Sequence, residues 1–575
     1  MSLRGDKRPR RRRRRHRHGW SSSTSASCIF KIMIATGTII AALGFGALVG
    51  AQSSGADWAW TDIEPSRTLE WHKCFDCNGQ CEGQLDCARL DVPMDWQNPS
   101  DDLRVVLAIT RMPAVNRTNY LGPVILNPGG TGGSGNYVLR LYGKYIQSVV
   151  GDNHDLISFD PRGIGASTPR YQCFDSPEEQ NIWDLQEPGI FGAYAGNEAD
   201  LYARALAYSQ QCERNVRKTG LVEHSGTTYI ARDMLEIVNQ GSHENLRFWG
   251  FSYGTVIGGV FAAMFPDRVE RLLSDANVGY LEWFKGTHRN FLNETEIAMD
   301  AFYHHCHKVG PDMCAFYESS PSAIELKLAN LFESLKKTPI IVPASKCAGG
   351  PSRPEIVTWS KVKKYLRDAL YQPYFEWTYF ANILAALDKG DGRPFYQWYN
   401  PPGYPSAPFC GAAVSPFEPL PGMPSGTKDA YPFMRCADRS ENGDNTFEEA
   451  VEAIEELIRW SPSTGAANAD NVFRCIGRTV QPKWRYEGYF NETTKHPILY
   501  VNNIGDAITP MVSAKLNSAG FPGSVVLQQN SLGHTFLAAP SNCTEKHIRE
   551  YFQTGKLPEE GTQCEGNTEP FWPPL

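Results

Sequence analysis

The sequence predicts an α/β fold in which a mainly parallel central sheet is covered by helices and interrupted by a large helical cap insertion. Two observations predict this fold: short apolar runs alternate with helix-like segments, and the runs stop midway along the chain and return only near its end. Such alternation favours a parallel sheet with helices on its faces. The strand-like runs lie at 103–110, 123–127, 155–160, 246–251, 271–275, 498–502 and 524–528.

The stretch between the two groups of strands has a helical and aromatic character. Ser322 and Glu325 have the spacing of a capping box at the start of one helix. Prolines crowd the segment from Asn400 to Gly426, which therefore forms neither strand nor helix. Because α/β proteins bind ligands beyond the carboxyl ends of their strands, we interpret this insertion as a cap over that edge. Candidate helices lie at 294–308, 322–337, 360–371, 375–388 and 447–460.

The chain of 575 residues is too long for one minimal core and fits a large domain with an insertion. No internal repeat is apparent, which argues against a repeat architecture. We divide the chain into a basic and Ser-rich tail (1–31), an apolar segment (32–51), the first part of the core (52–279), the cap (280–490) and the second part of the core (491–575).

The N-terminus carries signals for export. Ten Lys or Arg residues lie between Arg4 and Arg17, shortly before the apolar run 32–51. A basic block before an apolar segment follows the positive-inside rule, which predicts a type II membrane anchor with a lumenal or extracellular remainder. The small residues ending at Ala51 also allow cleavage by signal peptidase, which would release a secreted protein.

The charge of the exported part argues against a nucleic-acid partner. Beyond residue 51 the chain has 45 basic and 62 acidic residues, a net charge of −17. Such an acidic surface repels a phosphate backbone. The alternative, a nucleic-acid binder with a basic tail, predicts a cytosolic or nuclear protein with reduced cysteines.

Fourteen of the fifteen cysteines lie beyond the apolar run, an even number suited to disulfides, and only Cys28 lies before it. The spacing of Cys74, Cys77, Cys81 and Cys87 resembles a zinc site, but no matching distant ligand pair is apparent. The run 304–307 could also bind a metal, although we prefer a helix with surface histidines and one disulfide cysteine. Glycosylation sequons begin at Asn116, Asn293, Asn491 and Asn542.

A candidate nucleophile lies between the apolar run 246–251 and a helix-like segment at 255–265. Ser252 is the centre of a Gly-x-Ser-x-Gly pentapeptide at this strand-to-helix junction. Gly250 and Gly254 would leave room for the sharp turn that exposes such a serine. The pentapeptide alone is weak evidence, because a turn serine in a glycine-rich loop has the same pattern.

Asp506 and His534 are the candidate acid and base, because each follows one of the two returning strands. The order Ser, Asp, His is that of a nucleophile-elbow hydrolase. Asp275, which ends the strand after the nucleophile helix, is a competing acid. We expect activity to fall below roughly pH 6 as His534 becomes protonated.

The glycine-rich segment from Asn127 to Gly135 follows a strand and could provide an oxyanion hole. Backbone N–H groups of Gly130 and Tyr253 are the predicted donors. A phosphate-binding loop is the alternative, but the segment lacks the Gly-Lys-Ser/Thr ending of that motif.

These motifs, together with Asp160-Pro161-Arg162-Gly163 and Phe265-Pro266-Asp267-Arg268, resemble the tripeptidyl-aminopeptidase-like α/β-hydrolases, which are related to the proline iminopeptidases. The resemblance extends from about Trp71 to Cys564. It implies an α/β-hydrolase fold with a Ser-Asp-His triad and a helical cap, a secreted protein, and no metal or cofactor. Thr131 stands where such sequences usually have proline.

The resemblance implies release of residues or short peptides from free peptide N-termini through an acyl-enzyme. Such an activity needs an acidic group in the cap to hold the substrate ammonium, and Glu294, Glu296 and Asp300 are candidates. An esterase or lactonase acting on a small ester would use the same triad, because the fold does not set the substrate. A non-catalytic binding ectodomain is a further alternative, although no triad residue is missing.

Overall fold

The computed structural model describes residues 58–76, 84–241, 243–287, 290–345, 350–399, 414–440 and 446–572. The basic tail and the apolar segment 32–51 lie outside these residues. No helix in the described ranges is long and apolar enough to span a membrane.

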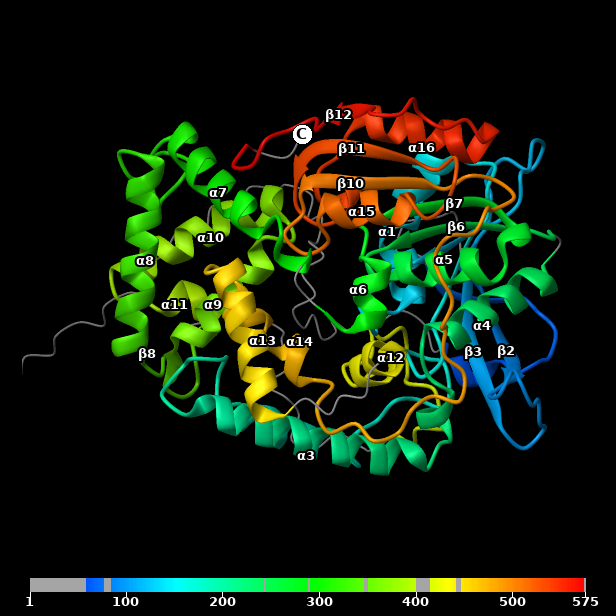
Figure 1. Ribbon diagram of the computed structural model, residues 1–575, viewed down its shortest axis with the longest axis horizontal. Coiled ribbons are helices and arrows are strands. Elements are labelled where there is room, and N and C mark those ends of the chain that lie inside the picture. The colour runs from blue at the N-terminus through cyan, green and yellow to red at the C-terminus, as the bar shows by residue number, and fades with distance from the viewer. Residues whose placement is uncertain are drawn as a thin grey trace, which may run out of the picture.

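A ten-stranded sheet runs through the described part of the chain (Figure 1). Its spatial order is β1-β2-β3-β5-β4-β6-β7-β10-β11-β12. The pairs from β1 to β5 in this order are antiparallel and all those from β5 to β12 are parallel, which confirms the mainly parallel sheet. The strands are β1 (His72–Asp76), β2 (Gln84–Pro93), β3 (Arg104–Met112), β4 (Val124–Asn127), β5 (Leu156–Phe159), β6 (Leu246–Phe251), β7 (Val269–Asp275), β10 (Leu499–Gly505), β11 (Val525–Leu532) and β12 (Gln563–Glu565).

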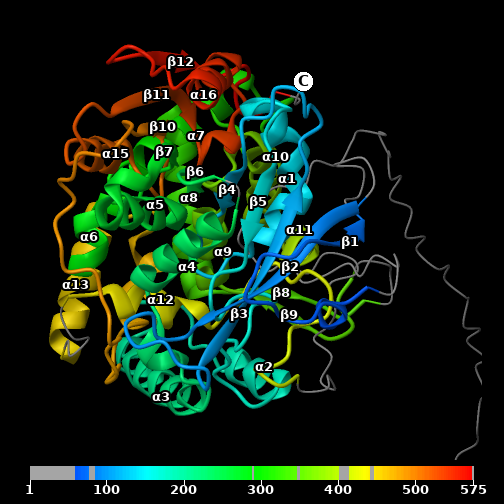
Figure 2. The same ribbon diagram turned by 90° about the vertical axis from the view of Figure 1, so that its right-hand side faces the viewer.

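Helices cover both faces of the sheet (Figures 1 and 2) and bury apolar side chains against it. On one face, α1 (Gly135–Val150) and α16 (Asn542–Thr554) pack residues such as Ile146 and Phe552 against Trp249 of β6. On the other face lie α4 (Thr227–Gln240), α5 (Tyr253–Met264) and α15 (Met511–Ser518). The catalytic candidates therefore lie on a sheet that is held from both sides.

Between β7 and β10 the chain leaves the sheet and forms a separate group of helices (Figure 1). Those between residues 295 and 399 share an apolar core, in which Phe302 packs against Trp377 and Phe380. They are accompanied by a small β8–β9 hairpin, Ile340–Val342 with Glu355–Val357. The helices are α6 (Tyr280–Lys285), α7 (Thr295–Val309), α8 (Pro321–Lys337), α9 (Trp359–Ala369), α10 (Pro373–Asp388), α11 (Arg393–Tyr399), α12 (Ala430–Asp438), α13 (Phe447–Trp460) and α14 (Asp470–Phe473).

The start of α8 differs from the predicted capping box. Ser320 is the N-cap and accepts a hydrogen bond from the Ala323 N–H, while Pro321 occupies the first helical position. Proline is favoured at that position because its missing N–H would have no partner there. Ser322 therefore lies inside the helix. Two further helices, α2 (Pro177–Leu185) and α3 (Asn197–Arg217), precede α4, and α3 packs against α13 and α14.

Every cysteine in the described ranges belongs to a disulfide. Cys74 bonds to Cys87, so these two do not form the zinc cluster that their spacing resembled; Cys77 and Cys81 lie outside the described residues. Because disulfides persist in oxidising compartments, this part of the protein is extracellular or secreted. The other bridges are Cys173–Cys212, Cys306–Cys314, Cys436–Cys475 and Cys543–Cys564.

Candidate active site

Ser252 occupies a strained turn between β6 and α5. Its backbone has φ 54° and ψ −123°, a conformation that residues with a side chain rarely adopt and that is typical of functional sites. A Cβ atom on Gly250 would lie 2.4 Å from the Gly254 carbonyl oxygen, and one on Gly254 would lie 2.5 Å from that of Asn127. Both glycines are therefore required for the chain to fold this sharply.

The glycine-rich loop after β4 packs directly against this turn. Gly129 and Gly130 have φ values of 84° and 117°, which glycine adopts without strain. A Cβ atom on Gly129 would lie 2.7 Å from the Tyr253 nitrogen and 2.9 Å from the Ser252 Cβ. Within the described residues the N–H groups of Gly130 and Tyr253 make no hydrogen bond, so both are available to an oxyanion.

The buried carboxyl of Asp160 stabilises the glycine-rich loop through hydrogen bonds. Ser134, the N-cap of α1, donates a hydrogen bond of 2.6 Å to Asp160 Oδ1, and the Ala166 N–H donates to Asp160 Oδ2 at 2.8 Å. Burial raises the pKa of Asp160 to about 6, although these hydrogen bonds favour its ionised form. The Asp-Pro-Arg-Gly motif thus supports the loop, and its Arg162 forms a fully buried ion pair with Asp233 at 2.6 Å.

A segment of the insertion also lies against the glycine-rich loop. The Ser134 N–H donates to the Ser425 carbonyl at 3.0 Å, and the Thr427 N–H donates to the Gly132 carbonyl at 2.8 Å. Thr427 Oγ1 accepts a further bond from the Gly165 N–H at 2.9 Å. The pattern of prolines around this segment did not predict such pairing.

Asp506 and His534 meet at the carboxyl ends of β10 and β11. His534 Nδ1 lies 2.9 Å from Asp506 Oδ2 and 3.2 Å from Oδ1, so the ring donates its Nδ1–H to the carboxylate. Asp506 is fully buried and His534 is 6% exposed. Within the described residues Nε2 of His534 makes no hydrogen bond, and this nitrogen is therefore free to accept a proton.

Thr509 completes this pair and was missed at the sequence level. Its hydroxyl donates to Asp506 Oδ2 at 2.7 Å and lies 3.1 Å from His534 Nδ1. The N–H groups of Ile508 and Thr509 also donate to Asp506 Oδ1, each at 2.9 Å. Four donors therefore surround the carboxylate and fix its orientation toward His534. The spacing Asp506-x-x-Thr509 could have indicated this turn, because Asp side chains commonly bond N–H groups two or three residues ahead.

Tyr371, between α9 and α10, holds His534 from the insertion side. Its carbonyl accepts the His534 N–H at 2.9 Å, and the two rings meet edge-on with centroids 5.2 Å apart. Gly533 allows this approach, since a Cβ atom there would lie 2.9 Å from the Tyr371 carbonyl and 2.6 Å from Pro373. No local sequence pattern could have identified this contact between remote segments.

Asp275, the competing acid, has other partners. Its Oδ1 accepts the Phe536 N–H at 3.1 Å and its Oδ2 accepts the Trp249 indole N–H at 3.3 Å. Burial raises its pKa to about 7. The carboxylate bonded to His534 is that of Asp506. Ser252 is linked to Asp275 only through the backbone, by a hydrogen bond of 3.0 Å from its N–H to the Asp275 carbonyl.

The three acidic candidates of the insertion differ in their surroundings. Glu294 is buried beside the turn that carries Asp506, and its Oε1 accepts the Met511 N–H at 3.0 Å. Glu296 accepts hydrogen bonds from Ser461 and Ser463, the shortest at 2.6 Å. Asp300 is exposed on α7.

The histidine run on α7 has local partners rather than a shared centre. His304 Nδ1 bonds to the Asp300 carbonyl at 2.8 Å and His307 Nδ1 to the Glu318 carbonyl at 3.1 Å. Cys306 is in a disulfide with Cys314, as we preferred from the sequence. Three sequon asparagines, Asn293, Asn491 and Asn542, are exposed and Asn116 is half-buried.

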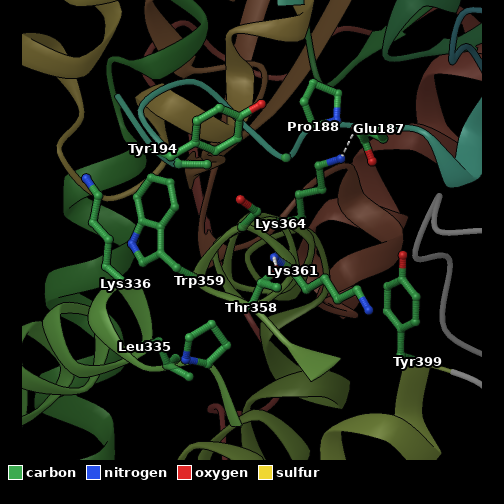
Figure 3. Close-up of a pocket in the computed structure, with 14 residues that line it drawn as sticks. Glu187, Pro188, Tyr194, Leu335, Lys336, Thr358, Trp359, Lys361, Lys364 and Tyr399 are labelled. Carbon is green, nitrogen blue, oxygen red and sulfur yellow. Dashed lines mark hydrogen bonds and ion pairs between the residues drawn. The ribbon is translucent and has the colours of Figure 1, made fainter. Parts of the chain in front are cut away.

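A pocket of about 320 Å³ lies between the start of α9 in the insertion and the segment from Glu187 to Tyr194 (Figure 3). Three lysines line it, and each ammonium has a neighbour already: Lys364 pairs with Glu187, Lys361 donates to the Ile356 carbonyl and Lys336 lies over the Trp359 ring. The far end of α9 leads to Tyr371 and His534, so the pocket and the catalytic pair lie at opposite ends of one helix.

The mainly parallel sheet with helices on both faces is that of the α/β-hydrolase fold. Residues 122–300, which carry the glycine-rich loop and Ser252, match the alpha/beta hydrolase fold family. Residues 461–564, which carry Asp506 and His534, match the TAP-like protein family. The resemblance to the tripeptidyl-aminopeptidase-like α/β-hydrolases is therefore confirmed.

Three known proteins align with most of the chain. Tripeptidyl aminopeptidase of Streptomyces lividans is 28% identical over 530 residues, which cover 87% of each chain. Serine protease Hip1 of Mycobacterium tuberculosis is 24% identical over 507 residues, which cover 86% of this chain and 91% of Hip1. Carboxylesterase B of the same species is 22% identical over 501 residues, which cover 83% of this chain and 86% of that protein. These similarities support a hydrolase.

Proposed function

We propose that this protein is a serine peptidase that releases residues or short peptides from the N-termini of peptide substrates. Ser252 Oγ attacks the scissile carbonyl while His534 Nε2 takes its proton and later gives it to the leaving amine. Asp506 orients His534 and stabilises its charged form. The N–H groups of Gly130 and Tyr253 stabilise the oxyanion, and water then releases the acyl-enzyme.

One observation carries this proposal: His534 is held by Asp506 through Nδ1 at 2.9 Å while its Nε2 has no partner in the described part of the chain. A histidine fixed in this tautomer is a base that awaits a nucleophile. The strained Ser252 is the candidate for that nucleophile. It follows β6, which is separated from β10 by β7 in the same sheet. Both groups need no metal or cofactor for acyl transfer.

The preference for peptides is supported by the similarity to tripeptidyl aminopeptidase and to serine protease Hip1. An aminopeptidase needs a carboxylate near the site, because the substrate ammonium loses water on binding and must regain a partner. Glu294 is only 7% exposed, and both carboxylate oxygens of Glu296 already accept hydrogen bonds from Ser461 and Ser463. We therefore propose a different carboxylate, that of Asp368.

Asp368 lies on the last turn of α9 and is close to the catalytic pair through Tyr371. Its carbonyl accepts the Tyr371 N–H at 3.1 Å. Burial raises the pKa of the Tyr371 hydroxyl to about 12; the charge of Arg367 lowers it, and the charges of Asp368 and Asp506 raise it. Asp368 Oδ1 accepts two hydrogen bonds from Arg367, at 2.9 and 2.8 Å. Oδ2 makes no hydrogen bond within the described residues, and the side chain is 24% exposed. This oxygen is thus available to an ammonium group.

A panel of substrates tests this function on the purified ectodomain. We expect turnover of aminoacyl-, prolyl- or tripeptidyl-anilides with a free N-terminus, and none after Ser252→Ala. Asp368→Asn should raise KM for these substrates by at least about tenfold, the cost of one charge-assisted hydrogen bond, with little effect on a small ester. Asp300→Asn is the matched control and should leave KM unchanged. Turnover of N-blocked peptides or esters alone would contradict the aminopeptidase assignment.

An esterase is the second candidate, because carboxylesterase B aligns with 83% of this chain. The same triad cleaves esters and amides, and the surrounding pocket decides between them. Efficient turnover of short-chain esters without turnover of any free-amine peptide would favour this candidate. A non-catalytic ectodomain would process neither class.

We also propose that the apolar segment 32–51 directs export, either as a type II membrane anchor or as a signal cleaved after Ala51. The basic residues before it and the disulfides after it support this route. N-terminal sequencing of the protein from both the membrane fraction and the medium distinguishes the two: a chain in the medium that begins at Gln52 is a cleaved, secreted protein, and a membrane-bound chain that keeps residues 32–51 is anchored.

A further inference from the structure

A second carboxyl lies directly behind the turn that presents Asp506. Glu294 precedes α7, which begins beside the turn after β10 and runs from there into the insertion (Figure 1), and Glu294 is only 7% exposed. Its Oε1 accepts the N–H of Met511, the first residue of α15, at 3.0 Å. The next residue adds another link, since Thr295 Oγ1 donates to the Ala507 carbonyl at 3.1 Å. Glu294 and Thr295 therefore bond to the turn 506–511 near its two ends.

The two carboxyls have opposite surroundings. Asp506 receives hydrogen bonds from four donors on Ile508, Thr509 and His534, and both of its oxygens have partners. Glu294 Oε2 is buried and accepts no hydrogen bond in the described structure. A carboxylate oxygen buried in this way is costly, whereas a carboxylic acid needs fewer donors.

When two carboxyls lie close together, repulsion between their negative charges raises the pKa of one of them. The carboxyl with fewer hydrogen-bond donors is the one that keeps its proton. We propose that Glu294 is a positioning residue that is protonated at neutral pH and, in that form, holds the turn 506–511 in place behind the catalytic acid. This inference rests on the proposed role of Asp506 in the triad.

The electrostatic surroundings agree with this assignment. Burial and the negative charge of Asp506 raise the pKa of Glu294 to about 8, and the N–H groups of Met511 and Asp506 and the charge of Lys515 oppose the shift only in part. The positive end of α15 also favours the ionised form, but this effect is small for one short helix. Above about pH 8 a second negative charge would then form beside Asp506 and weaken the turn.

The pH dependence of fluorophosphonate labelling at Ser252 tests the inference, because it reports on the triad without the choice of a substrate. The wild-type rate should fall above about pH 8. Glu294→Gln, which stays neutral at every pH and can still accept the Met511 N–H, should match the wild-type rate at pH 7 and remain flat to pH 9.5. Glu294→Ala should be at least tenfold slower at pH 7. Glu296→Gln, a matched change on the same helix, should keep the wild-type pH profile.

A Glu294→Gln profile with the wild-type alkaline fall, or a loss at pH 7 equal to that of Glu294→Ala, would overturn the inference. Thermal unfolding gives a readout that does not need activity. Because the folded-state pKa is raised, the folded protein holds a proton that the unfolded chain has lost, and wild-type stability should decline relative to Glu294→Gln from about pH 5 to pH 8. A constant difference across this range would refute the protonation. Absence of labelling in wild type at every pH would instead refute the triad.

Discussion

His534 donates its Nδ1–H to Asp506 at 2.9 Å, and Thr509 lies within hydrogen-bonding distance of both residues. The histidine therefore has one fixed tautomer, in which Nε2 carries the free lone pair. This geometry is the one a general base requires. It also distinguishes Asp506 from Asp275, another buried aspartate at the carboxyl ends of the strands, which does not bond to His534.

Thr509→Val should impair catalysis without unfolding the protein. The change removes a hydroxyl that donates to the ionised Asp506, and hydrogen bonds to charged groups contribute roughly 1.5–3 kcal/mol. We expect kcat/KM to fall roughly 10- to 100-fold, with Tm nearly unchanged. Thr509→Ser, which keeps the hydroxyl, should recover most of the activity. Equal rates for Thr509→Val and wild type would show that the Thr509 hydroxyl does not contribute to catalysis.

Asp506→Asn and Asp275→Asn should separate the two candidate acids. Asp506→Asn forces the wrong histidine tautomer, and by analogy with serine proteases we expect a loss of about 10⁴ in kcat. Asp275→Asn keeps an acceptor for the Phe536 N–H and should cost less than about tenfold, since it leaves the bond between His534 and Asp506 intact. A larger loss for Asp275→Asn than for Asp506→Asn would reverse the assignment. Single-turnover kinetics on the two variants measure this directly.

Asp275 should make stability depend on pH. Burial raises its folded-state pKa to about 7, well above the value of about 3.9 for an unfolded aspartate. The folded state therefore binds the extra proton, and its stabilising effect is complete below about pH 4 and lost as the pH rises toward 7. The Tm of wild type minus that of Asp275→Asn should fall across this range. A difference that grows with pH would show that Asp275 is ionised in the folded protein.

Gly254→Ala should disrupt the turn at Ser252. The added Cβ would lie 2.5 Å from the Asn127 carbonyl oxygen, and neither backbone segment can move without displacing the glycine-rich loop. We expect a loss of at least about 2 kcal/mol in the free energy of unfolding, as for other overpacked sites, and little soluble protein. Gly566→Ala is the control, because its Cβ would make only ordinary van der Waals contacts, at 3.4 Å or more. Similar denaturant midpoints for the two variants would show that the turn relaxes easily.

The parts of the site predicted from sequence are those with local patterns. Ser252 lies in a pentapeptide at a strand end, and Asp506 and His534 each follow an apolar run, so strand periodicity was sufficient to find them. Strand β2 was not predicted, because the charged residues Asp86 and Asp91 interrupt its apolar pattern. In the folded sheet, Arg111 and Arg104 on the adjacent strand neutralise them. Those partners become neighbours only when the sheet forms.

Contacts between remote segments could not be read from local patterns. Tyr371 reaches His534 from the insertion, and Thr427 pairs with the glycine-rich loop from nearly three hundred positions away. The cap acids show the same limit: Glu294 was considered as an ammonium ligand, but its carboxyl lies buried against Met511. Sequence spacing indicates which residues share a turn, and tertiary packing decides what each side chain faces.

Active-site labelling tests the central claim most directly. The purified ectodomain should react with a fluorophosphonate probe at neutral pH, and mass spectrometry of the digested product should find the adduct on Ser252. Ser252→Ala should show no labelling, while His534→Ala should fold normally and react at least about a thousandfold more slowly, because it lacks the general base. Equal labelling of wild type and Ser252→Ala, or an adduct on another residue, would contradict the assignment of the nucleophile.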